Sequence, residues 1–98
     1  MFIANLTYIK SLDEVENYLP SHISFLEHYY KIGKFICSGR KNPRTGGIIL
    51  CNETERESFM QILSEDPFYQ EQIADYEIIE FTPTKYADGF ELFLNSKA

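Results

Sequence analysis

The chain has 98 residues, of which 44% are hydrophobic and 15% aromatic, and its formal net charge at pH 7 is −6. This length and composition indicate one folded domain, and the negative charge argues against nucleic-acid binding. No apolar stretch approaches a membrane span, and the first residues lack the features of a signal peptide. Cys37 and Cys51 fit neither a disulfide framework nor a metal-binding knuckle. We therefore predict a cytoplasmic protein with reduced thiols.

Alternating side chains over residues 2–9 predict a first β-strand. Ser11 and Glu14 then have the spacing of a capping box, which predicts a short helical turn. Because proline suits the first turn of a helix, we expect Pro20 to begin a new helix. Gly33 is a typical C-terminal stop for that helix. The first third of the chain therefore predicts a strand followed by two helical pieces.

The remainder of the chain predicts three more strands and a second helical region. Thr54 and Glu57 form another capping box, so a second helix should begin there. Its inner side should carry Phe59, Met60, Ile62 and Leu63. Asp66 precedes Pro67, which predicts a break, with the Asp66 side chain capping a short helical piece that ends at about residue 73. We place the strands at residues 35–39, 47–52 and 76–83.

The predicted order is β-α-β-β-α-β, which is typical of a ferredoxin-like α+β domain, here over residues 1–83. Such a domain has a four-stranded antiparallel sheet with its helices on one face. The other face carries too many apolar residues to stay in water, so we expect a homodimer or a higher oligomer that covers it. Residues 84–98 form an apolar tail, which we expect to pack on the body or on the partner subunit.

A single histidine lies on the apolar side of the first long helix. On a helical wheel of residues 22–32, His22 falls in the middle of the core-facing arc, whereas His28 falls on the solvent side. Burying an imidazole costs free energy unless its nitrogen atoms have partners. His22 is therefore expected to have a polar partner from elsewhere in the chain.

Basic residues gather in the middle of the sequence. Residues 28–52 contain no Asp or Glu but hold five Lys or Arg residues, so this window carries +5 and the rest of the chain −11. Arg40 and Arg44 flank a loop from which guanidinium groups could bind a carboxylate or a phosphate. Alternatively, these cations pair with the surplus acidic residues, within one chain or across a dimer.

Several short motifs occur in a consistent order along the sequence. They are His22, Ser38-Gly39, Gly46-Gly47, Asp66-Pro67-Phe68 and Phe81-Thr82-Pro83. Together, over residues 2–83, they resemble the YciI-like (YCII-related) family. The resemblance implies a dimeric α+β barrel fold, related to the muconolactone isomerases, and a His/Asp pair in the active site. It also implies kinship with enzymes that act on chlorinated lactones by proton abstraction and dehalogenation.

The motif match assigns the pair to His22 and Asp66. A carboxylate bonded to one imidazole nitrogen fixes the tautomer and makes the other nitrogen a stronger base, able to remove a proton next to a carbonyl. Arg40 or Arg44 would hold the anionic group of the substrate. The remaining candidates for the pocket wall, each able to donate to an enolate oxygen, are Ser38, Tyr8 and Tyr29. Alternatively, the carboxylate only satisfies a core histidine.

The sequence therefore leaves two functions open. The first is a small cytosolic enzyme of the lyase, isomerase or dehalogenase type that acts on a small anionic carbonyl or lactone compound. The second is a non-catalytic dimeric domain that binds a ligand or a partner protein. Either function predicts a homodimer and a small anionic organic ligand or a protein, with no nucleic-acid or membrane partner.

No metal or other cofactor is expected. Histidines on opposite faces of one helix cannot chelate one metal ion, and no phosphate-binding glycine loop is visible. A symmetric hairpin could set Cys37 and Cys51 opposite each other, but we expect both to be buried, inert thiols.

Overall fold

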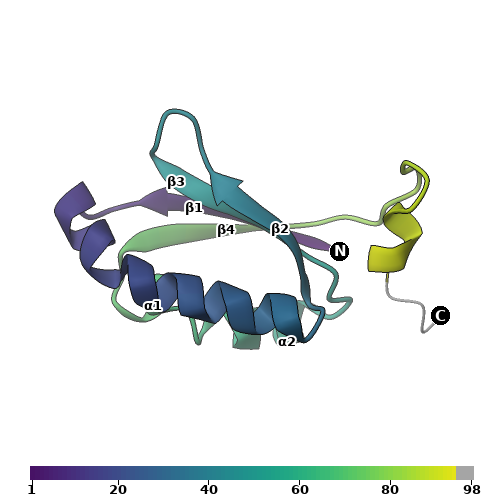
Figure 1. The fold of residues 1–98 in the computed structure, drawn as a ribbon, viewed down its shortest axis with the longest axis horizontal. Helices are drawn as coiled ribbons and strands as arrows, with labels where there is room; N and C mark the ends of the chain where they lie inside the picture. The colour runs from purple at the N-terminus through teal and green to yellow at the C-terminus, as the bar shows by residue number, and fades with distance from the viewer. Residues whose placement is uncertain (95–98) are drawn as a thin grey trace.

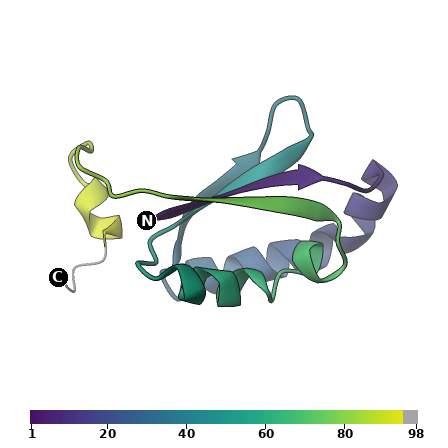
Figure 2. The ribbon, with the colours of Figure 1, turned by 180° about the vertical axis from the view of Figure 1, so that it is seen from behind.

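A four-stranded antiparallel sheet, in the order β2-β3-β1-β4, forms one layer of the molecule. In the computed structural model, which describes residues 1–94, the strands are β1 (Phe2–Tyr8), β2 (Phe35–Arg40), β3 (Gly46–Cys51) and β4 (Ala74–Glu80). The helices are α1 (Leu12–Lys31), α2 (Arg56–Leu63) and the short α3 (Pro67–Gln70). They cover one face of the sheet (Figures 1 and 2). The predicted ferredoxin-like α+β fold is therefore confirmed.

Helix α1 is one continuous helix, which corrects the prediction of two helical pieces. Pro20 lies inside it rather than at a start. Proline removes one backbone hydrogen bond and disfavours a straight helix, and Figure 1 shows the first turns of α1 at an angle to the rest. Ser11 caps the helix as predicted, because its hydroxyl accepts the backbone N–H of Glu14 at 3.3 Å. Gly33 follows the last turn with a φ of 80°, a conformation that glycine adopts without steric cost.

The capping box predicted at Thr54 does not form, and α2 begins two residues later with Glu55 at its N-cap position. Just before this N-cap, the buried Glu53 carboxylate binds both Lys34, at 3.1 Å, and the backbone N–H of Thr54, at 3.0 Å. Met60 was predicted to face the core but is 36% exposed. Strand β4 starts two residues earlier and ends three residues earlier than predicted.

The two faces of the sheet differ in what covers them. Alternate residues of the central strands pack against the helices in a core whose largest members are Phe2, Leu6, Ile49, Phe59, Leu63 and Phe68. On the opposite face, Ile3 is paired with Leu50 of β3 and with Ile79 of β4. Ile48 and Ile79 remain exposed on this open face. None of the helices in residues 1–94 is both long enough and apolar enough to cross a bilayer.

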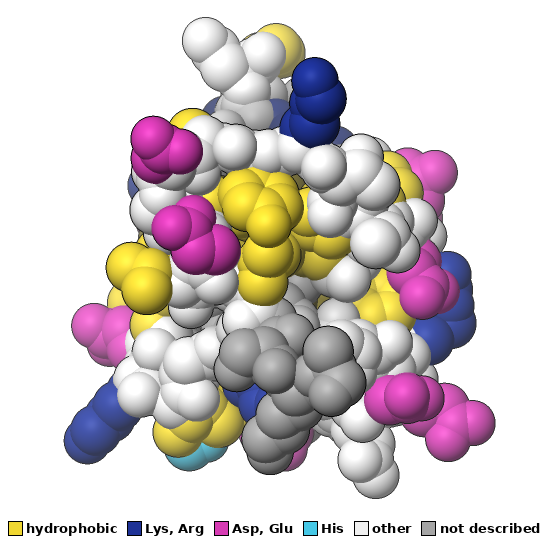
Figure 3. Space-filling view, turned by 90° about the vertical axis from the view of Figure 1, so that its right-hand side faces the viewer, with side chains coloured by type: hydrophobic (Ala, Val, Ile, Leu, Met, Phe, Trp, Pro, Cys, Tyr) yellow, Lys and Arg dark blue, Asp and Glu magenta, His cyan; other side chains and the backbone are white. Residues whose placement is uncertain are grey.

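After β4 the chain runs beyond the sheet and ends in a 3₁₀ turn, η1 (Phe90–Phe93), beside the N-terminal end of β1 (Figures 1 and 2). Leu92 is 84% exposed, and Tyr86 and Phe93 are also exposed. Figure 3 views the molecule from this end and shows apolar side chains gathered in its middle. The predicted packing of the 84–98 tail on a partner stays a prediction, and its last four residues lie outside those that the structure describes.

Two glycines at the start of β3 allow backbone segments to approach closely. A Cβ atom on Gly46 would lie 1.7 Å from the carbonyl oxygen of Leu6, and one on Gly47 would lie 2.9 Å from the carbonyl oxygen of Gly39. Both contacts are with backbone atoms, which cannot rotate away. Gly39 itself has open space around its Cβ position.

The Gly46→Ala variant should therefore be destabilised by about 2 kcal/mol or more, because the sheet has to distort to admit the methyl group. The measurement is urea unfolding of the variant and the wild type. Gly39→Ala is the matched control, a strand glycine with room for a methyl group, and should change the free energy of unfolding by about 0.5 kcal/mol or less. Equal losses in the two variants would contradict the steric argument.

Candidate functional site

The site begins where α2 ends and α3 starts. The Asp66 side chain caps α3 as predicted, since its Oδ1 accepts the backbone N–H of Phe68 at 2.9 Å. Pro67 occupies the first turn, where its missing N–H is not needed. This local geometry fixes the Asp66 carboxylate between the helices and the sheet, where it is fully buried.

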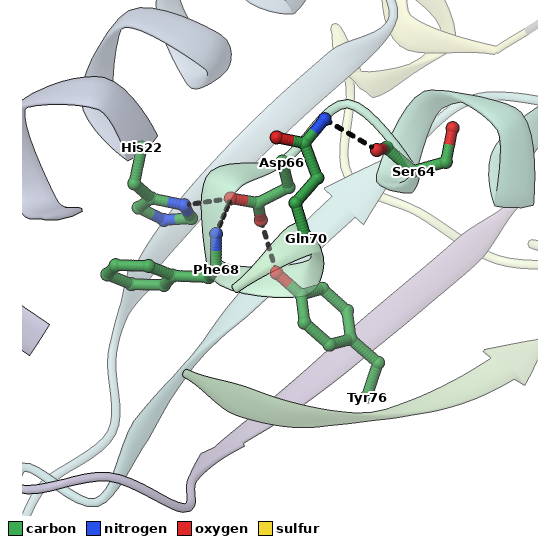
Figure 4. A network of polar contacts seen from close by, with 6 residues as sticks. All are labelled: His22, Ser64, Asp66, Phe68, Gln70 and Tyr76. Carbon is green, nitrogen blue, oxygen red and sulfur yellow. Dashed lines mark hydrogen bonds and ion pairs between the residues drawn. The ribbon is translucent and has the colours of Figure 1, made fainter. Parts of the chain in front are cut away.

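Two side chains from other elements also donate to this carboxylate. His22 of α1 places Nδ1 at 2.7 Å from Oδ1, and the hydroxyl of Tyr76 in β4 donates to Oδ2 (Figure 4). Burying a carboxylate is costly unless its oxygens are paired, and here both oxygens have donors. Asp66 therefore links α1, α3 and β4 through one charged group.

Within the described chain, one ring nitrogen of His22 is hydrogen-bonded and the other is not. Because the carboxylate is an acceptor, Nδ1 carries the proton, which leaves a lone pair on Nε2. The ring stacks on Phe68 with centroids 4.0 Å apart and an interplanar angle of 6°. Within residues 1–94, Nε2 has no hydrogen-bond partner, and the side chain borders a cavity although the residue is only 8% exposed. The orientation suits a base that faces a ligand.

Tyr76 was not predicted as a site residue. Burial raises the pKa of its hydroxyl far above the ordinary value, and the charge of Asp66 raises it further, so the hydroxyl remains a proton donor. The only sequence signal was an alternating tyrosine in a strand ten residues after Asp66. That signal was weak, because the predicted strand began at residue 76, whereas β4 begins at Ala74. Tyr76 was therefore placed at the end of the strand rather than inside it.

The cavity next to His22 has a volume of about 170 Å³ and lies between α1 and the strands β1, β2 and β3. Its wall is mostly apolar, with Leu6, Leu19, Ile23, Leu26, Ile49 and Phe68. Gly47 occupies a helix-facing position of β3, opposite Leu6, and therefore leaves space where a side chain would project. A volume of this size admits a compound of about one six-membered ring.

Three of the predicted substrate-binding residues border this cavity, namely Tyr8, Ser38 and Arg40. Tyr8 packs the edge of its ring on Phe68, with centroids 6.0 Å apart. Ser38 accepts a hydrogen bond of 2.6 Å from Tyr30. Arg40 makes no ion pair with any residue in the described part of the chain. The polar groups of the cavity are thus an imidazole, two hydroxyls and a guanidinium.

Arg44 and Tyr29, which were also predicted to bind the substrate, do not line this cavity. Arg44 binds Glu16 of α1 at 2.7 Å, and this bond holds the pKa of the guanidinium above its usual range. The Tyr29 hydroxyl donates to Glu65 at 2.7 Å, outside the cavity. Burial, followed by the bond to Glu65, raises the pKa of Tyr29 to about 12. Both side chains join elements of the fold.

The two cysteines are not opposite each other, because the pairing of β2 and β3 shifts register after Phe35 and sets Cys37 against Leu50. Cys37 is exposed, contrary to prediction, whereas Cys51 is buried. Burial raises the pKa of Cys51 to about 11, which makes it a poor nucleophile. Among residues 1–94, no three His, Cys, Asp or Glu side chains gather as a metal site would require.

Comparison with known proteins identifies the family. The model of the YCII-related domain matches residues 1–82. The chain belongs to the YCII-related family. No curated protein matches the chain.

A solved structure gives an independent view of the fold. The chain is similar to 5-chloro-2-hydroxyhydroquinone dehydrochlorinase (TftG) from Burkholderia phenoliruptrix AC1100, in complex with 2,5-dihydroxybenzoquinone. The TM-score is 0.69 at 14% sequence identity, over 84% of this chain and 94% of the other. At this identity the likeness establishes a shared fold.

The Tyr76→Phe variant should lose about 1–3 kcal/mol of stability, because Asp66 Oδ2 would be left buried without a donor. The free energy of unfolding in urea measures this loss. Tyr69→Phe serves as the control, since Tyr69 is an exposed neighbour whose ring contacts Tyr76 at 5.4 Å between centroids. Its hydroxyl makes no hydrogen bond within residues 1–94, so the control should stay within about 0.5 kcal/mol of wild type. If the free energy of unfolding of Tyr76→Phe equals that of wild type, Asp66 Oδ2 needs no donor and the argument is wrong.

Proposed function

We propose that the protein is a small acid–base enzyme of the lyase, isomerase or dehalogenase type, in which His22 removes a proton from a small anionic ring or carbonyl compound. One observation carries the proposal: the buried Asp66 carboxylate holds Nδ1 of His22 while the ring borders the cavity. A histidine that served only to fill the core would have both nitrogens buried and paired, whereas Nε2 of His22 is not among the buried polar atoms of residues 1–94 that lack a partner and is accessible from the cavity.

The geometry favours Nε2 as the base. Asp66 holds the ring in the tautomer with the lone pair on Nε2, and it stabilises the imidazolium that forms when that nitrogen takes a proton. Tyr76 and the backbone of Phe68 keep the carboxylate in place. Stacking on Phe68 limits rotation of the ring, so the base is oriented before a ligand arrives.

The step balances without a cofactor. His22 takes a proton from a carbon or hydroxyl conjugated to a carbonyl, and the electron pair left behind forms an enolate. In an isomerase, the proton returns to another carbon of the same compound. In a dehalogenase or another lyase, the electron pair expels a leaving group such as chloride, and the proton passes to water. Arg40 supplies a positive charge at the cavity for an anionic substrate.

The similar solved structure supports a ring compound as the ligand. That protein is a dehydrochlorinase of a chlorinated hydroxyhydroquinone and was solved with a dihydroxybenzoquinone. A single oxygenated ring also fits the volume of about 170 Å³ and the apolar wall of the cavity described above. We therefore infer a hydroxylated quinol or quinone, or a small lactone, as the substrate class.

We also propose that two copies of the chain pack through the open face of the sheet. Ile48 and Ile79 are exposed there, beside Ile3 and Leu50, and a contiguous apolar face of this kind is typical of an interface. Glu77 also lies on this face, where its carboxylate accepts a hydrogen bond from Asn5. A two-fold dimer would pack this patch against the same patch of the other copy. This arrangement would form the dimeric α+β barrel that the family resemblance implies.

The His22→Gln variant should lose about 100-fold or more in turnover, since an amide cannot act as the base. The assay follows deuterium exchange and product formation by NMR with small lactones, keto acids and hydroxylated quinols, including 5-chloro-2-hydroxyhydroquinone. His28→Gln is the matched control, because His28 is an exposed histidine of the same helix. It should retain wild-type turnover.

Two results would reject the enzyme proposal. One is a wild-type protein that binds a compound of the panel without exchanging or converting it, which favours a non-catalytic ligand-binding domain. The other is a His22→Gln variant that turns over as fast as wild type.

The Ile79→Lys variant should be monomeric, because it buries a charge in the proposed interface. Sedimentation measures the mass, and wild type should have twice the mass of one chain. Ile32→Lys is the control, since Ile32 is also exposed, at 53% against 43% for Ile79, but lies at the end of α1, away from the open face. The exposed thiol of Cys37, which pairs with Leu50 on the open face, should react slowly in the dimer and rapidly in the monomer. A monomeric wild type would refute the interface.

A further inference from the structure

Ser38 lies between a tyrosine and the cavity. It belongs to β2, and its pairing with Ile49 places it on the helix-facing side of the sheet, where it borders the cavity with His22. The hydroxyl of Tyr30, at the end of α1, donates to Ser38 Oγ at 2.6 Å. Tyr30 does not border the cavity itself. The tyrosine can therefore act on a ligand only through the serine.

The hydrogen bond from Tyr30 affects which way the Ser38 hydroxyl proton points. A serine hydroxyl has one proton to donate, and its oxygen can accept. A phenol is a stronger acid than an aliphatic alcohol, so Tyr30 is the better donor of this pair and Ser38 the better acceptor. With Tyr30 as the donor, the serine proton points away from the tyrosine oxygen. Within residues 1–94, Ser38 Oγ donates to no protein acceptor. Ser38 is only partly buried, so this proton is available to solvent or to a ligand that displaces solvent from the cavity.

The tyrosine is held in place by packing. Its ring lies edge-on to Phe35, with centroids 6.0 Å apart and an interplanar angle of 83°. Phe35 is a buried residue at the start of β2, the strand that also carries Ser38. Tyr30 is 37% exposed, so this edge contact and the bond to Ser38 are what restrain its ring.

We propose that Tyr30 is a positioning residue that turns the hydroxyl of Ser38 into a directed donor for an oxyanion of the substrate. This inference rests on the proposed function and deepens it, because it names where the enolate oxygen binds. Chained hydrogen bonds polarise one another, so the donation from Tyr30 also strengthens the donation from Ser38. The oxyanion then meets Ser38 and Arg40 on the β2 wall, while His22 receives the proton on the α1 wall.

The test is a double-mutant cycle with 2,5-dihydroxybenzoquinone as the probe, because this compound is a stable ring anion. Its dissociation constant is measured by absorbance for wild type, Ser38→Ala, Tyr30→Phe and the double variant. Ser38→Ala should weaken binding about tenfold or more, and Tyr30→Phe by about three- to tenfold. The effect of Tyr30→Phe should disappear when Ser38 is already alanine. Ser38→Thr, which keeps the hydroxyl, should bind within about threefold of wild type.

The Tyr29→Phe variant is the control for removing a tyrosine hydroxyl. It makes the same change one residue away, where the hydroxyl donates to Glu65 outside the cavity. It should leave the affinity for the probe unchanged. If Tyr30→Phe weakens binding equally in the presence and absence of the serine hydroxyl, its role is structural and the inference is wrong. A wild type that does not bind the probe overturns it as well.

Failure of this inference is separable from failure of the proposed function. The binding cycle uses a compound that need not react, so it reports on the oxyanion donor alone. The turnover of His22→Gln reports on the base alone. If His22→Gln loses turnover but the effects of Ser38→Ala and Tyr30→Phe are additive, the proposed function stands. Only the role assigned to Tyr30 is then rejected.

Discussion

The buried carboxylate of Asp66 is the constraint on which both the fold and the site depend. An isolated carboxylate in an apolar interior is strongly disfavoured, so the chain must bring donors to it from wherever they are available. Here they come from the backbone of α3, from His22 of α1 and from Tyr76 of β4. The same contacts that satisfy the charge fix how the long helix lies against the sheet. They also leave one histidine nitrogen directed away from Asp66, so positioning of the base is a consequence of satisfying the core.

The space that this base faces is also a result of backbone geometry. Gly46 and Gly47 let β3 lie close to its neighbours, and Gly47 contributes no side chain to the helix-facing layer. The large apolar side chains of α1 and β1 surround the gap without filling it. A largely apolar pocket with a few convergent polar groups has the character of a ligand site, which agrees with the proposed function. A core histidine alone would not require it.

The parts of the site that obey local rules could be predicted from the sequence, and the parts that depend on long-range pairing could not. Asp66 before Pro67 predicts a cap whatever the rest of the chain does, and the helical period is enough to turn His22 inward. The helical wheel placed Tyr29 and Tyr30 on one arc, however, and only their partners distinguish them. The Tyr29 hydroxyl donates to Glu65 outside the cavity, whereas the Tyr30 hydroxyl donates to Ser38 on the cavity wall. Tyr76 was missed for the same reason, since its contact with Asp66 depends on the register of β4.

The basic window of the sequence illustrates how one charge pattern can serve two purposes. Arg44 and Lys34 each bind a glutamate, so for them the alternative that the cations pair with surplus acids is correct. Arg40 borders the cavity and makes no ion pair in the described chain, so it remains available for the anion-binding role proposed above. This difference matters because the rest of the chain is strongly negative and would repel an anionic ligand. A cation on the β2 wall offsets that repulsion at the place where the ligand's charge would lie. Because it belongs to a different wall from His22, it can hold an anion while leaving Nε2 free to accept the proton.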